Sequence, residues 1–322
     1  MEAETRYHPS AAQLALASAI DESLGALLPL SRLHAALHEN FETWKSLEEV
    51  GVFGIGVSED LGGSGLGAVE EALIVMSLGR RLASPAVLAT VAAAHSRLSG
   101  SADASGANLR VTAAYRRGDR IIVVDEPGVD LVLLRDPGGA ALHYSGAGTS
   151  KIADGRLWLA ALREVADVGE NLVQFDEFQL ARLRLIDAAA LAGIAEATLE
   201  MSVAYAGMRE QFGRPIGSFQ AVKHHCANMA IAARCARDQT NFAAMALDEG
   251  RADAQLQVEC AFFVAGSSAI ENAGKNIQIH GGMGFSDEAH PHLFLKRAQL
   301  ALAIAGGLEA ASSRIANTKA DW

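Results

Sequence analysis

A long helical repeat in the C-terminal half constrains the fold of this chain more than any other feature. Apolar and small residues recur there at alternating intervals of three and four, which aligns them along one narrow helical face. This seam comprises Phe219, Val222, Cys226, Met229, Ala233, Ala236, Thr240, Ala243 and Leu247. Ser218 is a suitable N-cap and Gly250 a suitable terminator. A helix with such a seam packs nearly parallel to its neighbours, so the pattern predicts a helical bundle.

The rest of the C-terminal half completes that bundle. A second apolar stripe, from Ile186 to Met208, predicts a helix before the seam. Further helices are expected over 252–278 and from Pro291 to the C-terminus. Four long antiparallel helices follow from these patterns.

The first 180 residues show other residue patterns than the predicted bundle. Amphipathic patterns predict helices over 11–28, 33–50 and 68–82, with a glycine-dense loop between the last two. Short β-prone runs alternate with turn signals over 109–178, which predicts a small antiparallel sheet or barrel. We therefore expect a mainly α fold with a small β domain. An N-terminal α-helical domain covers 1–106, a shortened β domain 107–180 and a C-terminal helical bundle 181–322.

Composition excludes several classes of function. The formal net charge of −11 argues against a nucleic-acid-binding surface. The sequence contains no uninterrupted run of about 18 apolar residues, so no membrane span is expected. The N-terminus is charged and lacks the apolar core of an export signal. Three cysteines do not form a disulfide framework, so a reducing cytoplasm is expected. His224, His225 and Cys226 are consecutive and point in different directions on a helix, so no metal site is expected.

Two segments, 209–216 and 278–285, combine residue types that suit a flat cofactor bearing a pyrophosphate. Arg209 offers a permanently charged fork, and Phe212 can pack on a flat ring. Gly281 and Gly282 leave backbone N–H groups open to phosphate or ribityl oxygens, and Gln278 both donates and accepts. The alternatives are a surface ion pair of Arg209 with Glu210 or Glu200 and a plain core contact of Phe212.

Both segments resemble the flavin-contacting motifs of the acyl-CoA dehydrogenase family. The order of helices, β domain and bundle is also that of the family, and similarity extends over 44–51, 61–65, 78–81 and about 184–315. The resemblance implies FAD as cofactor, an acyl-CoA substrate and an electron acceptor for the reduced flavin. It also implies that Arg209, Phe212, Gln278, Gly281 and Gly282 reach across to an FAD held mainly by a neighbouring subunit.

Other parts of the family pattern are missing. The Thr-Glu-Pro-type loop with its Gly-Ser-Asp run and the Trp-Ile-Thr/Ser strand, which hold the flavin, have no counterpart, and residues 112–118 stand where the loop should lie. The resemblance places the catalytic carboxylate at Ala305 or at Leu183, and neither side chain can abstract a proton. Asp187, one turn after Leu183, is a weak replacement, and its plainer interpretation is an ordinary acidic residue in a first helical turn.

We therefore expect a subunit of a heteromeric, FAD-dependent acyl-CoA dehydrogenase that performs α,β-dehydrogenation of a CoA thioester. We expect a homologous partner subunit to supply the catalytic base. The chain resembles the truncated subunits of α2β2 enzymes in actinobacterial steroid catabolism. This resemblance implies a steroid-derived substrate. Two alternatives stay open at this stage. One is an active homotetramer that uses Asp187 as the base, and the other is a structural subunit without flavin.

Overall fold

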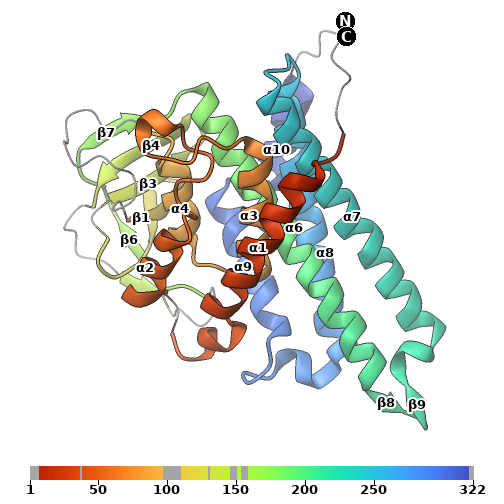
Figure 1. Cartoon of the computed structure of the whole chain (residues 1–322). Coiled ribbons are helices and arrows are strands. Elements are labelled where there is room, and N and C mark those ends of the chain that lie inside the picture. Colours follow the sequence, from red (N-terminus) through yellow and green to blue (C-terminus); the bar gives the residue numbers. More distant parts are fainter. Residues whose placement is uncertain are drawn as a thin grey trace, which may run out of the picture.

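The chain folds into helices, then one sheet, then a set of long helices (Figure 1). The computed structural model describes residues 7–36, 38–96, 110–129, 131–145, 151–153 and 159–318. This element order confirms the expected fold class, a mainly α chain with a small β region. The domain boundaries at 106 and 180 stay a prediction, and residue 106 lies outside the described residues.

The N-terminal helices begin at residues that the sequence marks as caps. The elements are α1 (Ala11–Leu27), η1 (Leu30–His34), α2 (Phe41–Glu49), η2 (Glu59–Leu61), α3 (Ala68–Arg80) and α4 (Pro85–Ala93). The continuous helix expected over 33–50 is wrong. Asn40 accepts a hydrogen bond from the Thr43 N–H at 2.8 Å and starts α2 there, while Glu39 turns inward to pair with Arg32 at 2.9 Å.

The sheet is mixed, which corrects the expected antiparallel arrangement. Its strands are β1 (Val111–Arg117), β2 (Arg120–Val124), β3 (Leu131–Asp136), β4 (Gly139–Tyr144), β5 (Lys151–Ala153), β6 (Leu162–Val165) and β7 (Asn171–Gln174). Their order is β5-β6-β2-β1-β3-β4-β7, and β1 pairs with β3 in parallel. The β1–β2 hairpin occupies one edge of β1, so β3 returns along the other edge in the same direction as β1.

The long helices form the predicted bundle, with two local corrections. The elements are α6 (Glu177–Met208), β8 (Glu210–Gln211), β9 (Arg214–Pro215), η4 (Ile216–Ser218), α7 (Gln220–Asp248), α8 (Ala254–His280), η5 (Gly281–Phe285), α9 (Pro291–Ile304) and α10 (Gly307–Asn317). Ser218 lies in η4 and is not the N-cap of α7, which is Phe219. The last expected helix breaks at Gly306 and Gly307, both with positive φ, so that α9 and α10 are separate.

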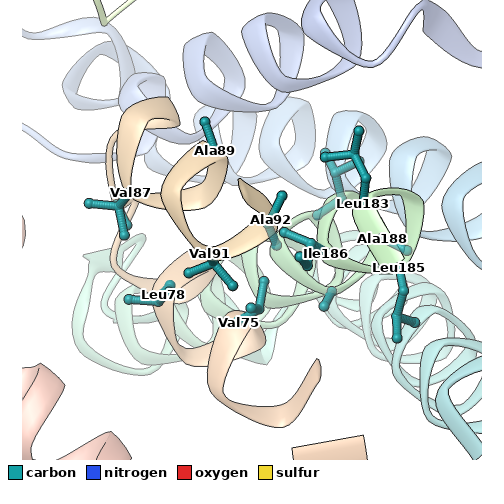
Figure 2. Packing of buried hydrophobic residues seen from close by; sticks show 14 of the residues in the cluster. Val75, Leu78, Val87, Ala89, Val91, Ala92, Leu183, Leu185, Ile186 and Ala188 are labelled. Carbon is teal, nitrogen blue, oxygen red and sulfur yellow. The ribbon is translucent and has the colours of Figure 1, made fainter. Parts of the chain in front are cut away.

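Close packing of α3 against α6 joins the N-terminal helices to the bundle. A Cβ on Gly79 would lie 2.1 Å from the Ala190 carbonyl oxygen, and one on Gly193 would lie 2.0 Å from the Met76 carbonyl oxygen. Only glycine permits this approach of two helix backbones. Figure 2 shows side chains of α3, α4 and α6 filling the adjoining core, among them Val75, Val91 and Ile186. The abundance of alanine reflects this short distance between helices.

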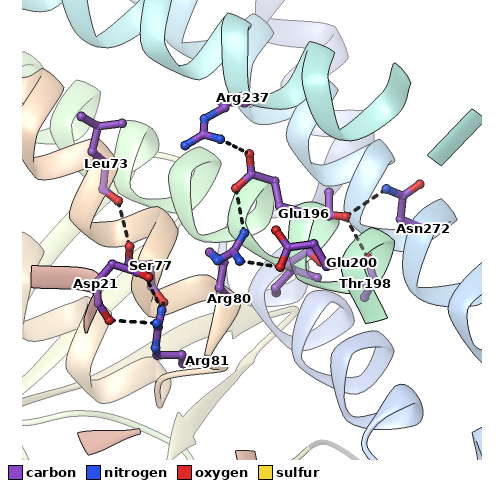
Figure 3. Close-up of polar contacts among 12 residues, drawn as sticks. Asp21, Leu73, Ser77, Arg80, Arg81, Glu196, Thr198, Glu200, Arg237 and Asn272 are labelled. Carbon is purple, nitrogen blue, oxygen red and sulfur yellow. Dashed lines mark hydrogen bonds and ion pairs between the residues drawn. The ribbon is translucent and has the colours of Figure 1, made fainter. Parts of the chain in front are cut away.

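Buried charges cross the same junction. Arg80 of α3 pairs with Glu196 and Glu200 of α6 at 3.3 and 2.6 Å, and Glu196 also pairs with Arg237 of α7 at 2.9 Å (Figure 3). Burial raises the pKa of Glu196, although the two arginines favour its charged form. Glu196, the least exposed of the four side chains, keeps an opposite charge on either side, and these pairs join α3, α6 and α7.

One stretch among the described residues, Ala11–His34, has the length and composition of a membrane span. It covers α1 and η1, which Pro29 separates, and most of it is not buried. Leu24 and Leu28 pack in the core, and Asp21 pairs with Arg81 at 2.6 Å. A single stretch of this kind near an N-terminus is weak evidence for a span.

Glu126, which follows β2, is a buried acid whose pKa lies well above the ordinary value for glutamate. It is 7% exposed, and its Oε1 accepts no hydrogen bond from the part of the chain that the structure describes. Burial and the nearby Glu39 carboxylate raise the pKa of Glu126 to about 7, against the opposing effects of the Trp44 hydrogen bond and Arg297. The folded protein therefore holds a proton on Glu126 that the unfolded chain loses at lower pH.

We expect Glu126 to contribute a fall in the free energy of unfolding as pH rises from 5 to 8, because its folded-state pKa is raised, whereas the lowered pKa values of His280, His290 and His292 act in the opposite direction. The fall amounts to about 2–3 kcal/mol for a shift from an unfolded value near 4.5 to about 7. Glu126→Gln should remove this part of the pH dependence, measured by urea unfolding at both pH values. Trp44→Phe, which removes a hydrogen bond to the carboxylate, should steepen it. Equal slopes for Glu126→Gln and the wild-type chain would contradict the assignment.

Candidate functional site

The residues of the two flavin-type motifs meet at one end of the bundle. Helices α6 and α8 run in the same direction and end there, and β8 and β9 project beyond them (Figure 1). Tyr205 of α6 stacks on His280 of α8 with ring centroids 4.0 Å apart, which joins the two helix ends. Sequence analysis missed this pair, although Tyr205 lies one helical turn before Arg209 and His280 lies inside the second motif. Burial lowers the pKa of His280, which favours its neutral form.

Arg209 and Phe212 lie on the hairpin that follows α6. Arg209 ends the helix, its N–H donates to the Tyr205 carbonyl at 2.8 Å, and its own carbonyl accepts from the Ile216 N–H at 2.7 Å. Glu200, one proposed ion partner of Arg209, pairs instead with Arg80. Phe212 is 92% exposed at the hairpin tip, so the core-contact interpretation is wrong.

Phe212 also has an unusual backbone. Its φ of +53° lies in the left-handed region, where a bulky residue is strained. Its ring contacts the edge of Phe219 with centroids 6.1 Å apart, and the Arg214 guanidinium lies 4.2 Å from the Phe219 ring centre. An exposed, strained aromatic next to two exposed arginines is a feature that we associate with ligand or partner binding.

Gln278, Gly281 and Gly282 are exposed where α8 ends. Gly281 is the C-cap of α8, with φ +61°, and its N–H donates to the Gln278 carbonyl. No described atom lies within 4 Å of a Cβ built on Gly281 or Gly282, so this turn is open to a bound group. Lys275 Nζ donates to Gln278 Oε1 at 3.4 Å. Exposed cations, open glycines and a flat ring fit the pyrophosphate and ring system of a dinucleotide.

The two positions where a catalytic carboxylate is expected lie close together at the other end of α6. Leu183 and Ala305 are each 4% exposed, and both belong to the hydrophobic core. The adjacent Arg184 donates from Nη1 to the Ala305 carbonyl oxygen at 2.7 Å, which connects the start of α6 to the end of α9. Neither position carries a group that takes up a proton.

Asp187 lies within a buried cluster of charges. Its Oδ2 is 2.5 Å from Arg135 Nη1 and 3.7 Å from Arg184 Nη1. Arg184 Nε is in turn 3.5 Å from Glu259 Oε1 of α8. Burial lowers the pKa of Arg184, while Asp187 and Glu259 favour its charged form. Sequence analysis missed Arg135 and Glu259, because their partners are distant along the chain.

The cysteines and the possible metal ligands were two further candidates for a site. Cys226, Cys235 and Cys260 are free thiols. Within the described ranges, no group of three or more His, Cys, Asp and Glu side chains is placed to hold a metal ion.

Comparison with known proteins identifies the family. Residues 13–104 match the model of the acyl-CoA dehydrogenase N-terminal domain, and residues 174–319 match that of the acyl-CoA dehydrogenase C-terminal domain. The chain is 33% identical over 305 residues to acyl-CoA dehydrogenase FadE34 of Mycobacterium tuberculosis, covering 80% of this chain and 40% of FadE34. It is 30% identical over 262 residues to acyl-CoA dehydrogenase IpdE2 of the same organism, covering 79% of each.

Solved structures share the fold at lower identity. The ChsE4-ChsE5 complex from Mycobacterium tuberculosis aligns with a TM-score of 0.73 at 24% identity, covering 98% of this chain and 100% of that one. The steroid ACAD Tcur3481-Tcur3483 aligns with a TM-score of 0.77 at 21% identity, covering 95% of this chain and 97% of that one. With family models matched in both halves and a relative matched over most of its length, the chain belongs to the acyl-CoA dehydrogenase family.

Proposed function

We propose that this chain is one subunit of an FAD-dependent acyl-CoA dehydrogenase built from two unlike chains. The observation that carries the proposal is the contrast between the two ends of α6. One end presents Arg209 and Phe212 to solvent, whereas Leu183 and Ala305 at the other end are apolar and buried. The chain thus has groups for contacting a cofactor at an interface, whereas neither Leu183 nor Ala305 can remove a proton from a substrate.

The exposed end suits the FAD of a neighbouring subunit. Arg209 binds a pyrophosphate through paired, charge-assisted hydrogen bonds. Phe212 packs against a ring, and the N–H groups near Gly281 and Gly282 approach phosphate or ribityl oxygens. Gln278 completes the set with one amide that donates and accepts. When bound, FAD supplies the acceptor for the hydride that leaves the β carbon of the thioester.

The partner subunit supplies the carboxylate that removes the α proton. A positioned general base contributes roughly 10²–10⁴ in rate, so a centre without one is effectively silent. Asp187 does not fill this role in our proposal, because Arg135 lies 2.5 Å from its Oδ2 and holds it in an ion pair. The homotetramer alternative requires that pair to open.

The names of the structural neighbours support our proposal for the substrate class and the assembly. The structural neighbours include a complex of two named chains, ChsE4-ChsE5, and a steroid ACAD, Tcur3481-Tcur3483. We extend this to a steroid-derived CoA thioester and an α2β2 heterotetramer for the present chain. The reduced flavin then passes its electrons to a separate acceptor. Three free cysteines are compatible with a reducing cytoplasm.

The subunit composition and flavin content of the protein purified from its native host test the proposal. We expect one FAD per pair of unlike chains, together with oxidation of an acyl-CoA. One FAD per identical chain would support the homotetramer, and a partner without any flavin would support the structural alternative.

Arg209→Ala should weaken FAD binding to the heteromer by roughly 10- to 100-fold, the equivalent of a lost charge-assisted hydrogen bond of about 1.5–3 kcal/mol. Titration of the flavin-depleted complex with FAD, followed by flavin fluorescence, gives the affinity. Arg234→Ala is the matched control, because Arg234 is an exposed arginine on α7 that pairs with Asp238 at 2.6 Å. Equal FAD affinity in both variants would contradict the role of Arg209.

Phe212→Gly should separate binding from stability. Glycine accepts φ +53° without strain, so we expect the free energy of unfolding to stay within about 1 kcal/mol of the wild-type value. Loss of the ring should lower FAD affinity roughly three- to tenfold. Phe212→Tyr keeps the ring and should bind FAD normally. Weak binding by the tyrosine variant would show that a stacked ring is not what the site requires.

Asp187→Asn distinguishes the two catalytic models. If the partner supplies the base, turnover per folded complex should stay within about twofold of the wild-type rate, because asparagine still accepts a hydrogen bond from Arg135. If Asp187 is the base, turnover should fall by about 10² or more. The rate of flavin reduction under single-turnover conditions measures this step directly.

A further inference from the structure

A row of polar contacts joins α6 to α8 near the ends of these helices that carry the two motifs (Figure 1). On α8, Asn272, Asn276 and His280 follow one another at intervals of four and so share one helical face. Asn272 Nδ2 donates to the Ala195 carbonyl oxygen at 3.0 Å. Ser202 Oγ donates to Asn276 Oδ1 at 2.9 Å, and both residues are fully buried. Paired polar groups therefore interrupt buried helix faces that are otherwise rich in alanine.

The Tyr205–His280 stack is the last contact of this row. The two rings have centroids 4.0 Å apart and planes 25° apart. The Tyr205 hydroxyl donates to the His280 carbonyl oxygen at 3.5 Å, and His280 Nδ1 lies 2.8 Å from the Asn276 carbonyl oxygen. Because a carbonyl oxygen only accepts, Nδ1 carries a proton. Burial lowers the pKa of His280 and favours the neutral imidazole. The bond to Asn276 and the stack together hold this ring in one orientation.

Each of the two rings is connected to one half of the exposed site. The Tyr205 carbonyl oxygen accepts from the Arg209 N–H at 2.8 Å, where α6 ends and the hairpin begins. His280 immediately precedes Gly281, whose N–H donates to the Gln278 carbonyl oxygen. The hairpin with Arg209 and the turn with Gly281 are thus each attached to one member of the stack.

Polar contacts of this kind determine how two helices align along their axes. Contacts between alanines alone do so weakly, because a shift by one turn replaces one small residue with another. Such a shift moves a residue by about 5.4 Å, whereas a binding site tolerates displacements of only about 0.5 Å. A buried polar pair opposes the shift, since each separated group would be left without a hydrogen-bond partner.

We propose that the Tyr205–His280 stack, with the Ser202–Asn276 pair behind it, positions the two motif segments relative to each other. Both rings act through the segments that follow them in sequence, and neither needs to touch the cofactor. The inference rests on the proposed function in one respect, because that proposal assigns FAD to these segments. Their mutual positioning is a property of this chain alone and is measurable without FAD.

Hydrogen exchange of the flavin-depleted complex, followed by peptide mass spectrometry, tests the positioning. Tyr205→Ala removes the ring from α6, and we expect exchange over 278–285 on α8 and its turn to become roughly three- to tenfold faster. Tyr205→Phe keeps the ring and should exchange like the wild-type chain. Val203→Ala is the matched control, because Val203 lies two residues away on α6 and is 51% exposed. Unchanged exchange over 278–285 in Tyr205→Ala would overturn the inference.

The affinity for FAD shows what the positioning does for binding. Tyr205→Ala should weaken FAD binding to the heteromer roughly tenfold, and Tyr205→Phe should stay within about twofold of the wild-type affinity. Because the ring acts partly through Arg209, Tyr205→Ala combined with Arg209→Ala should lose less affinity than the product of the two single effects. Fully multiplicative effects would overturn the inference. FAD binding that does not depend on Arg209 would instead overturn the proposed function.

A second variant covers the case in which Tyr205→Ala does not fold well. His280→Ala removes the ring from the other helix and should speed exchange over 205–212 by a similar factor. His280→Phe places a flat ring at the same position and should restore slow exchange in both segments. Fast exchange in a folded His280→Phe variant would overturn the inference, because a stacked ring would then not be what positions them.

Discussion

The approach of α6 to α3 is the constraint on which the rest of the structure depends. Gly79 and Gly193 bring the two backbones so close that any larger residue would collide with a carbonyl group. This contact fixes a helix of 32 residues, α6, against the N-terminal helices, and the bundle helices then pack around it. Both parts of the candidate site lie at the ends of that helix. Leu183 and Arg209 are separated by 26 residues, or about 39 Å along the helix axis.

That separation is the physical reason why we propose that the two ends belong to different reaction centres. Reacting groups must approach within about 3–3.5 Å. A base near Leu183 therefore does not reach a substrate bound against a ring near Arg209 of the same chain. In our proposal, the exposed end therefore contacts a cofactor across an interface. The strained backbone of Phe212 and its 92% exposure are consistent with a tip that completes a neighbour's site. At the buried end, Arg135 and Asp187 form an ion pair.

Features set by local sequence were predictable, whereas those set by distant partners were not. Spacing predicted the helical seam over 219–247, and the motifs located Arg209 and Gln278 on what proved to be exposed helix ends. The spacing of apolar residues did not separate α9 from α10. The break between them follows from the positive φ of Gly306 and Gly307, which only the structure shows. The same spacing did not predict the parallel pairing of β1 with β3. This pairing depends on which edge of β1 remains open after β2 has paired with the other. The contact of Arg184 with Ala305 joins residues 121 positions apart, and no local pattern records it.

The distance between the two ends also makes the loss of one function compatible with retention of the other. Substitutions more than about 7–10 Å apart without shared partners have nearly additive effects on free energy. Substitutions at Ala305 should therefore have little effect on the hairpin at Phe212. In the heteromer that we propose, the partner's centre needs only the exposed end of this chain, so substitutions at the buried end act through packing and through the pairing of its charges.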